Sequence, residues 1–160
     1  MLKNITDIFI VFGAKYLLFL IIGLAVVYFL RQSKNIRKKV VIFGAFVLPI
    51  AFVISRIVAH FYYNARPFVV EGITPLIAHA ADNGFPSDHA LLGCAIAAVV
   101  FRFDKKYGVA VFLLSLIVGF SRVFAGVHHS LDIWGSVAIV LFSAIISQIL
   151  FQYYFEKKLK

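Results

Sequence analysis

Apolar runs close to the length that crosses a lipid bilayer recur along the whole chain. A helix needs about 20 mostly apolar residues to span the hydrocarbon core of a bilayer. With 62% of its 160 residues hydrophobic and 14% charged, the chain has too few polar side chains to cover a water-soluble surface. The sequence therefore predicts an all-α, polytopic membrane helical bundle that forms a single membrane-embedded domain over residues 1–160.

About five transmembrane helices are expected, and the third is the shortest. They lie within Ile5–Leu30, Val40–Tyr62, His89–Phe103, Tyr107–Val123 and Leu131–Tyr154. Lys15 interrupts the first run, and two interpretations stay open. Either an interfacial helix from Leu2 to Gly13 precedes the true span and makes six helices, or the lysine extends its amine to the membrane surface.

The basic residues of the chain predict its orientation. They cluster in Arg31–Lys39, in Arg102–Lys106 and in the C-terminal segment 156–160. With five spans, all three clusters fall on one side, which the positive-inside rule makes the cytoplasmic side of the plasma membrane. The N-terminus, the segment Tyr63–Asp88 and the turn Phe124–Ser130 would then lie outside, and the C-terminus inside.

The net charge of +9 does not indicate a nucleic-acid partner. The basic residues stand in short clusters beside apolar runs, whereas a nucleic-acid surface needs a basic stripe with interleaved aromatic side chains. We expect the lipid bilayer and a membrane lipid as partners. The oligomeric state is left open.

Three polar segments adjoin the predicted outer ends of the spans. They are "NARPF" (Asn64–Phe68), "GFPSDHALLG" (Gly84–Gly93) and "SRVFAGVHHSLD" (Ser121–Asp132). Polar groups that come from separate parts of a membrane protein and meet at one face are candidates for a functional site.

The residue types in these segments favour phosphate chemistry. Arg66 and Arg122 carry guanidinium groups suited to phosphate oxygens. Ser87 precedes a predicted helix start, where its hydroxyl and the backbone N–H groups near Asp88 favour an anion. With two histidines near such an anion, one can attack phosphorus while the other protonates the departing oxygen.

Asp132 follows His128 by four residues, so both share a helical face if the last span has begun there. A carboxylate beside an imidazole N–H fixes the tautomer and stabilises the charge that develops. Asp82, Asp88 and Glu71 are scattered, so no carboxylate cluster suited to Mg²⁺ is expected. We therefore predict chemistry without a metal or another cofactor.

Together these segments resemble the type 2 phosphatidic acid phosphatase superfamily of membrane lipid phosphatases. The signatures of that family read K-x6-R-P, P-S-G-H and S-R-x5-H-x3-D. The matching residues here are Arg66-Pro67, Pro86-Ser87-Asp88-His89, and Ser121-Arg122 with His128 and Asp132. The third signature matches at every fixed position, which is far more specific than one short motif.

The resemblance implies a role for each residue. His128 would be the nucleophile that forms a phosphohistidine, Asp132 would orient it, and His89 would be the general acid. The phosphate would be held by Arg66, Ser87, Arg122 and the backbone N–H groups near Asp88. His129 is the rival nucleophile, but the spacing to Arg122 and Asp132 favours His128.

Two positions depart from the family pattern. Ala59 stands where the family has its lysine, and Arg56 or His60 are the candidates to compensate. Asp88 stands where glycine is usual, and it is as compatible with a helix cap as with a role in catalysis. Isolated histidines in membrane proteins are usually packed or hydrogen-bonded, so we expect His60 and His79 to be structural or interfacial.

"PSDH" and "GVHHSLDIWGS" resemble the branch of the family that acts on undecaprenyl diphosphate. The resemblance implies hydrolysis of that lipid to undecaprenyl phosphate at the outer membrane face. Phosphatidic acid, phosphatidylglycerophosphate and lipid A phosphates are the alternative substrates. A transporter or an inactive scaffold are the non-enzyme alternatives. A transporter predicts charges spread through the bilayer depth, and Ala59 favours a scaffold.

Overall fold

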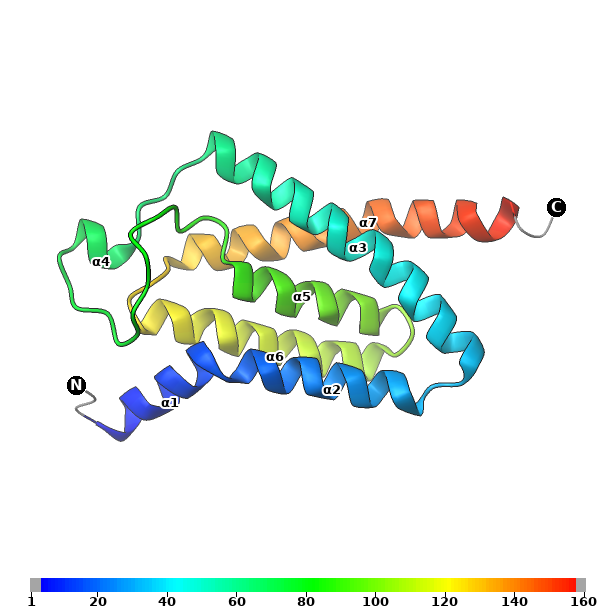
Figure 1. Ribbon diagram of the computed structural model, residues 1–160, viewed down its shortest axis with the longest axis horizontal. Coiled ribbons are helices and arrows are strands. Elements are labelled where there is room, and N and C mark those ends of the chain that lie inside the picture. Colours follow the sequence, from blue (N-terminus) through cyan, green and yellow to red (C-terminus); the bar gives the residue numbers. More distant parts are fainter. Residues whose placement is uncertain (1–3, 158–160) are drawn as a thin grey trace.

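The protein is a bundle of helices in the computed structural model, which describes residues 4–157 (Figure 1). Seven helices and no strand occur in these residues. The helices are α1 (Ile5–Lys15), α2 (Leu17–Arg31), α3 (Lys34–Phe61), α4 (Pro67–Val70), α5 (Asp88–Phe101), α6 (Lys105–Phe124) and α7 (Ser130–Lys157). The predicted all-α membrane bundle is confirmed, and each predicted apolar run forms helix.

The helices differ in whether they can cross a bilayer alone. Three of them, α3, α6 and α7, are long and apolar enough, and α1 with α2 makes a fourth if this pair, bent by 49°, is one span. α5 has 14 residues. At about 1.5 Å per residue it falls short of a hydrocarbon core of about 30 Å. The five predicted spans are thus three long helices, a bent pair and one short central helix.

The first apolar run breaks at Tyr16. α1 ends at Lys15, whose side chain is exposed, and α2 begins at Leu17. The interfacial helix expected from Leu2 to Gly13 therefore ends two residues later, and its first two residues lie outside the described chain. A helix break leaves carbonyl groups without an intrahelical partner, and the carbonyl of Ala14 accepts a hydrogen bond from Arg122 Nη1 at 3.1 Å.

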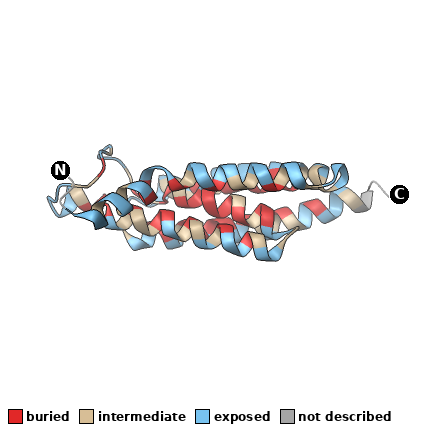
Figure 2. Ribbon diagram, turned by 90° about the horizontal axis from the view of Figure 1, so that it is seen from below, coloured by how far each residue is buried: buried red, intermediate tan, exposed pale blue. Residues whose placement is uncertain are grey.

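α5 lies at the centre of the bundle, between α3, α6 and α7 (Figure 1). Small buried side chains such as Ala90, Cys94 and Ala97 let the neighbouring helices approach it. Gly93 is the extreme case, because a Cβ there would lie 2.8 Å from Ser115 Oγ on α6. Buried residues gather on the inner faces of the helices, while the large apolar side chains on the outer faces are exposed (Figure 2). That distribution suits contact with lipid.

The two ends of the bundle have different compositions. The turns from α2 to α3 and from α5 to α6 and the end of α7 lie at one end, which we call the basic end (Figure 1). The long segment around α4, the start of α5 and the turn from α6 to α7 lie at the other, which we call the site end. All three polar segments predicted to converge are at the site end.

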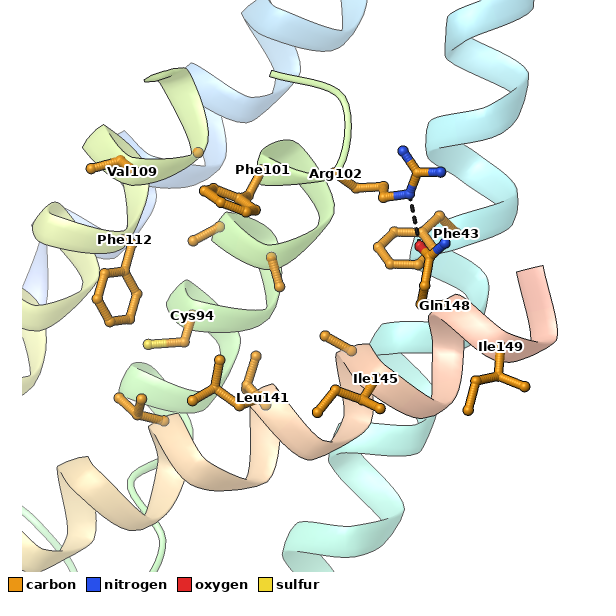
Figure 3. Close-up of a pocket in the computed structure, with 16 residues that line it drawn as sticks. Phe43, Cys94, Phe101, Arg102, Val109, Phe112, Leu141, Ile145, Gln148 and Ile149 are labelled. Carbon is orange, nitrogen blue, oxygen red and sulfur yellow. Dashed lines mark hydrogen bonds between the residues drawn. The ribbon is translucent and has the colours of Figure 1, made fainter. Parts of the chain in front are cut away.

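An apolar groove opens towards the basic end, between α5, α6 and α7 (Figure 3). Its volume is about 550 Å³, and its lining is apolar apart from Arg102 and Gln148. Arg102 Nε donates a hydrogen bond of 2.7 Å to Gln148 Oε1. The groove contains none of the residues predicted to bind phosphate.

Candidate active site

Helix ends carry most of the predicted site residues. Arg66 precedes α4, Ser87 precedes α5, His89 lies in the first turn of α5, Arg122 in the last turn of α6, His128 between α6 and α7, and Asp132 in the first turn of α7. All of these except His89 are buried, although four of the five have charged or titratable side chains. Such burial is rare for polar side chains unless they have a partner or a function.

The turn between α6 and α7 places His128. Gly126 has φ of +77°, a conformation that glycine adopts without steric cost and that turns the chain after α6. Asp132 Oδ2 then accepts hydrogen bonds from His128 Nδ1 at 3.1 Å and from the backbone N–H of His129 at 2.8 Å. His128 precedes α7, so the contact does not come from a shared helical face. Asp132 reaches back from the first turn of α7, as a capping residue does.

The partners of His128 define which nitrogen is available for chemistry. Because Nδ1 donates to Asp132, the lone pair is on Nε2. Arg66 Nη1 lies 3.3 Å from that Nε2. Burial lowers the pKa of His128, and the nearby Arg122 and Arg66 lower it further, against the opposing effect of the hydrogen bond to Asp132. The imidazole is therefore neutral at neutral pH, which is the form a nucleophile needs.

His129 is held differently. Its Nε2 lies 3.1 Å from the carbonyl oxygen of Ala65. Its backbone N–H donates to Asp132, but its ring makes no contact with that carboxylate in the described structure. This geometry supports His128 over His129 as the reacting histidine.

Arg66 is held by a carboxylate and two backbone carbonyl groups. Its Nε donates to Asp82 Oδ1 at 2.7 Å, its Nη1 to the carbonyl of Val127 at 2.8 Å, and its Nη2 to the carbonyl of Asn83 at 3.4 Å. The guanidinium is thereby held beside His128, with a carboxylate as its counter-ion.

Arg122 forms no ion pair with a carboxylate among residues 4–157. It is 3% exposed, and its hydrogen bond to another described residue runs from Nη1 to the carbonyl of Ala14. Among the described residues, Arg122 Nε and Ser87 Oγ are the buried side-chain atoms without a hydrogen-bond partner. A buried charge and a buried hydroxyl left unpaired are costly. Both atoms are therefore suited to an incoming anion.

The N-terminus of α5 adds backbone donors. The first hydrogen bond of this helix runs from the N–H of Leu91 to the carbonyl of Ser87, which leaves the amides of residues 88–90 unpaired within the helix. The positive end of the helix dipole also favours an anion here. His89 lies in this turn, close enough to Arg122 and His128 to interact electrostatically with both.

Asp88 and Arg56 form an ion pair at the rim of the site. Arg56 Nη2 donates to Asp88 Oδ1, and the Arg56 guanidinium also lies 5.4 Å from the ring centre of Phe52. Arg56 is therefore held next to Ser87 and His89 by a carboxylate. The exposed His60 packs against the ring of Phe61 instead.

Four residues of the site were not selected from the sequence: Asn64, His79, Asp82 and Asn83. Asn64 Nδ2 donates to Asp132 Oδ1 at 2.7 Å. Asn83 Oδ1 accepts from the backbone N–H groups of Asn64 and Phe85, both at 3.0 Å. Asn64 lay within a segment that had been selected, but the others lie in a stretch without motif spacing. No group of three His, Cys, Asp or Glu side chains suited to a metal occurs in the described part of the chain.

The chain is similar to known proteins in sequence. Residues 57–157 match the PAP2 superfamily. The chain is 35% identical over 136 residues to the bacitracin transport permease protein BcrC of Bacillus licheniformis, covering 84% of this chain and 66% of that protein. It is 33% identical over 141 residues to the undecaprenyl-diphosphatase BcrC of Bacillus subtilis, covering 87% and 72%. The match thus spans slightly less than two thirds of the first relative.

A solved structure is also similar. The crystal structure of Aquifex aeolicus LpxE superimposes with a TM-score of 0.70 at 25% sequence identity, covering 92% of this chain and 87% of that one.

Proposed function

The chain belongs to the PAP2 superfamily, and we propose on that premise that it is a metal-independent lipid phosphatase that works through a phosphohistidine. The proposed substrate is undecaprenyl diphosphate, which would be converted to undecaprenyl phosphate. Phosphatidic acid, phosphatidylglycerophosphate and lipid A phosphates are the alternatives within the same reaction class.

One observation carries this proposal. Arg122 Nε and Ser87 Oγ are buried without a partner, and both belong to residues next to the His128–Asp132 pair. A phosphoryl group would supply acceptor oxygens for both atoms and a counter-charge for the arginine.

The first chemical step uses the two histidines. His128 Nε2 attacks the terminal phosphorus of the diphosphate, and the bond from that phosphorus to the bridging oxygen breaks. His89 donates its proton to the bridging oxygen, which leaves as part of undecaprenyl phosphate. Asp132 keeps the proton on Nδ1 and stabilises the charge on the phosphorylated imidazole.

The second step regenerates the enzyme. Water attacks the phosphohistidine, the deprotonated His89 accepts its proton, and the bond from Nε2 to phosphorus breaks. Inorganic phosphate leaves, and His128 is neutral again. In both steps Arg66, Arg122, Ser87 and the free amides of α5 would stabilise the charge on the phosphoryl oxygens.

The proposed substrate rests on similarity to a named relative, and the proposed membrane face rests on the positions of the basic residues. A relative of 33% identity is named undecaprenyl-diphosphatase. The basic clusters Arg31–Lys39 and Arg102–Lys106, together with the C-terminal end of α7, lie at the end of the bundle opposite the site (Figure 1). By the positive-inside rule, we propose that the site faces the outside of the plasma membrane, with the N-terminus outside and the C-terminus in the cytoplasm.

Transport is the second function to consider, because one relative is named a transport permease. A transport path requires polar groups through the depth of the membrane. The buried Ser115, Ser143 and Ser147 donate to carbonyl groups of their own helices. The groove at the basic end is apolar apart from Arg102 and Gln148. These features favour an enzyme over a transporter.

The test is release of inorganic phosphate by the purified protein in detergent with a metal chelator present. We expect undecaprenyl diphosphate to be hydrolysed faster than phosphatidic acid or phosphatidylglycerophosphate. Rapid quenching with labelled substrate should trap an acid-labile phosphoprotein in the wild type and none in His128→Ala. Absence of phosphate release from every lipid would contradict the enzyme and favour the inactive scaffold.

A further inference from the structure

His79 lies in the segment between α4 and α5, and its side chain contacts His128 of the candidate site. Its ring meets that of His128 edge to face, with 6.1 Å between ring centres and 75° between ring planes. Sequence reasoning predicted a structural or interfacial role for this histidine. Its contact with the proposed nucleophile calls for a different interpretation.

The two nitrogens of His79 have different surroundings. Nδ1 lies 3.3 Å from the carbonyl of Ala80 and 4.0 Å from Asp82 Oδ1. Nε2 has no hydrogen-bond partner among the described residues. The side chain is 25% exposed, so water and a substrate phosphate can reach it. The carboxylate near Nδ1 would support a protonated ring that donates from Nε2.

Charged and titratable groups face His79 from every element around the pocket. They are Arg66 before α4, Asp82 in its own segment, His89 on α5, Arg122 on α6 and His128 before α7. Burial lowers the pKa of His79, and Arg66 lowers it further, against the Ala80 carbonyl and Asp82. Burial and the two arginines therefore favour the neutral ring of His79. A phosphoryl anion between the arginines would reverse the sign of the local field and favour the protonated ring.

The other candidates for an extra cation are occupied elsewhere. Arg56 is paired with Asp88, and His60 is exposed against Phe61. His79, in contrast, is close enough to both buried arginines, Arg66 and Arg122, to interact with them electrostatically.

We propose that His79 is a third imidazole of the phosphoryl pocket, which takes up a proton as phosphate binds and donates a hydrogen bond from Nε2 to it. The inference rests on the proposed function for its substrate. It deepens that function, because the affinity for the substrate would depend on pH through a residue outside the family signatures. His79 binds phosphate in this scheme and takes no part in bond breaking, so its effect falls on KM.

The experiment compares the wild type with three variants over about pH 6 to pH 8, the range in which histidine titrates. His79→Gln removes the charge and keeps a hydrogen-bond donor. His79→Lys makes the charge permanent. His60→Gln is the matched control, because it removes an exposed histidine near the end of α3 that packs against Phe61. Each protein is measured for KM, for kcat, and for affinity towards inorganic phosphate by calorimetry in two buffers of different ionisation enthalpy.

We expect the KM of the wild type to be lowest at acid pH. His79→Gln should raise KM at pH 6 by about tenfold, the size expected for a lost charge-assisted hydrogen bond, with kcat changed less than about threefold. His79→Lys should bind tightly at both ends of the pH range. The titration of phosphate itself affects the pH dependence of KM equally in all four proteins, so it does not contribute to the differences between them. The calorimetry should show fewer protons taken up by His79→Gln than by the wild type.

Two results would overturn the inference. One is an unchanged KM and proton uptake in His79→Gln. The other is a His79→Lys protein as weak as His79→Gln, since that would indicate packing against His128 and no binding of phosphate. A different result would contradict the proposed function and leave the inference intact. In that case the wild type would bind inorganic phosphate with the predicted dependence on His79 but would hydrolyse no lipid.

Discussion

Arg122 and Arg102 lie near opposite ends of the hairpin formed by α5 and α6, and they differ in solvent exposure and in their hydrogen-bond partners. Arg102, at the basic end, is exposed, donates to the neutral side chain of Gln148 and lies over the rings of Phe103 and Phe151. Arg122, at the site end, is 3% exposed and has an unpaired Nε. Exposed cations at a membrane surface can serve orientation. A buried cation without a carboxylate indicates a ligand.

The backbone also differs between the two ends of the bundle, and again the unusual features lie at the site end. At the site end the break after α1, the start of α5 and the turn before α7 leave peptide groups that face the buried polar side chains. At the basic end the turn from α5 to α6 is short and self-contained, with Asp104 accepting from the N–H of Tyr107 at 3.0 Å. Irregular backbone inside a membrane protein is tolerated where it serves a cavity or site. Paired substitutions at the two ends test whether this contrast reflects function.

The largest effect is expected at the nucleophile. His128→Ala should lower kcat by at least about 10⁴-fold, because loss of a nucleophile removes the covalent route. His129→Ala, the neighbouring control, should stay within about tenfold of the wild type, since its loss removes a contact to Ala65 and no reacting atom. Phosphate release under saturating lipid measures both. A reversed order would move the nucleophile to His129.

Asp132→Asn is expected to rank next, with kcat lower by about 10³- to 10⁴-fold, because an amide cannot hold the tautomer of His128 in the same way. Asp104→Asn is the partner substitution at the basic end. That residue caps α6, so the variant should keep full activity and lose at most about 1 kcal/mol of stability. Equal rates for wild type and Asp132→Asn would remove the carboxylate from the mechanism.

Arg122→Lys tests the contrast most directly. It should reduce kcat/KM by about 10²-fold, because lysine keeps the charge but loses the planar fork that holds a phosphate. Arg102→Lys should change kcat/KM less than about twofold, since an exposed cation at the basic end is replaced by another. If both variants behaved alike, burial of Arg122 would have no functional meaning.

The smallest effect is expected at the unpaired hydroxyl. Ser87→Ala should lower kcat by about 10- to 100-fold, the range for one lost donor to a transition state. Its thermal midpoint should barely change, because Ser87 Oγ has no partner to lose. Ser143→Ala on α7 removes a buried hydroxyl that donates to the carbonyl of Ile139, and activity should be unaffected. A large drop in the thermal midpoint of Ser87→Ala would instead indicate a structural hydroxyl.

Much of the site was predictable because the sequence spacing reflects helix ends. Ser87 and His89 were expected at a helix start, and they lie at the start of α5. His128 and Asp132 were expected to share a helical face if the last span had begun at His128. α7 begins at Ser130, and the link forms from its first turn back to His128. Asn64, Asp82 and Asn83 escaped prediction because their partners are 16 to 68 residues away in the chain.

The length and spacing of the apolar runs by themselves determined that this chain is a helical membrane protein with its polar segments grouped between spans. The reason is that a chain in a bilayer must satisfy its backbone hydrogen bonds internally, and helices do so. Only the tertiary structure decided which charges are compensated. It pairs Arg56 with Asp88 and Arg66 with Asp82, it leaves Arg122 Nε without a hydrogen-bond partner among the described residues, and it brings the ring of His79 against that of His128. Charge pairing depends on distances of a few ångströms between helix ends, and those distances follow from how closely small residues such as Gly93 let the helices pack.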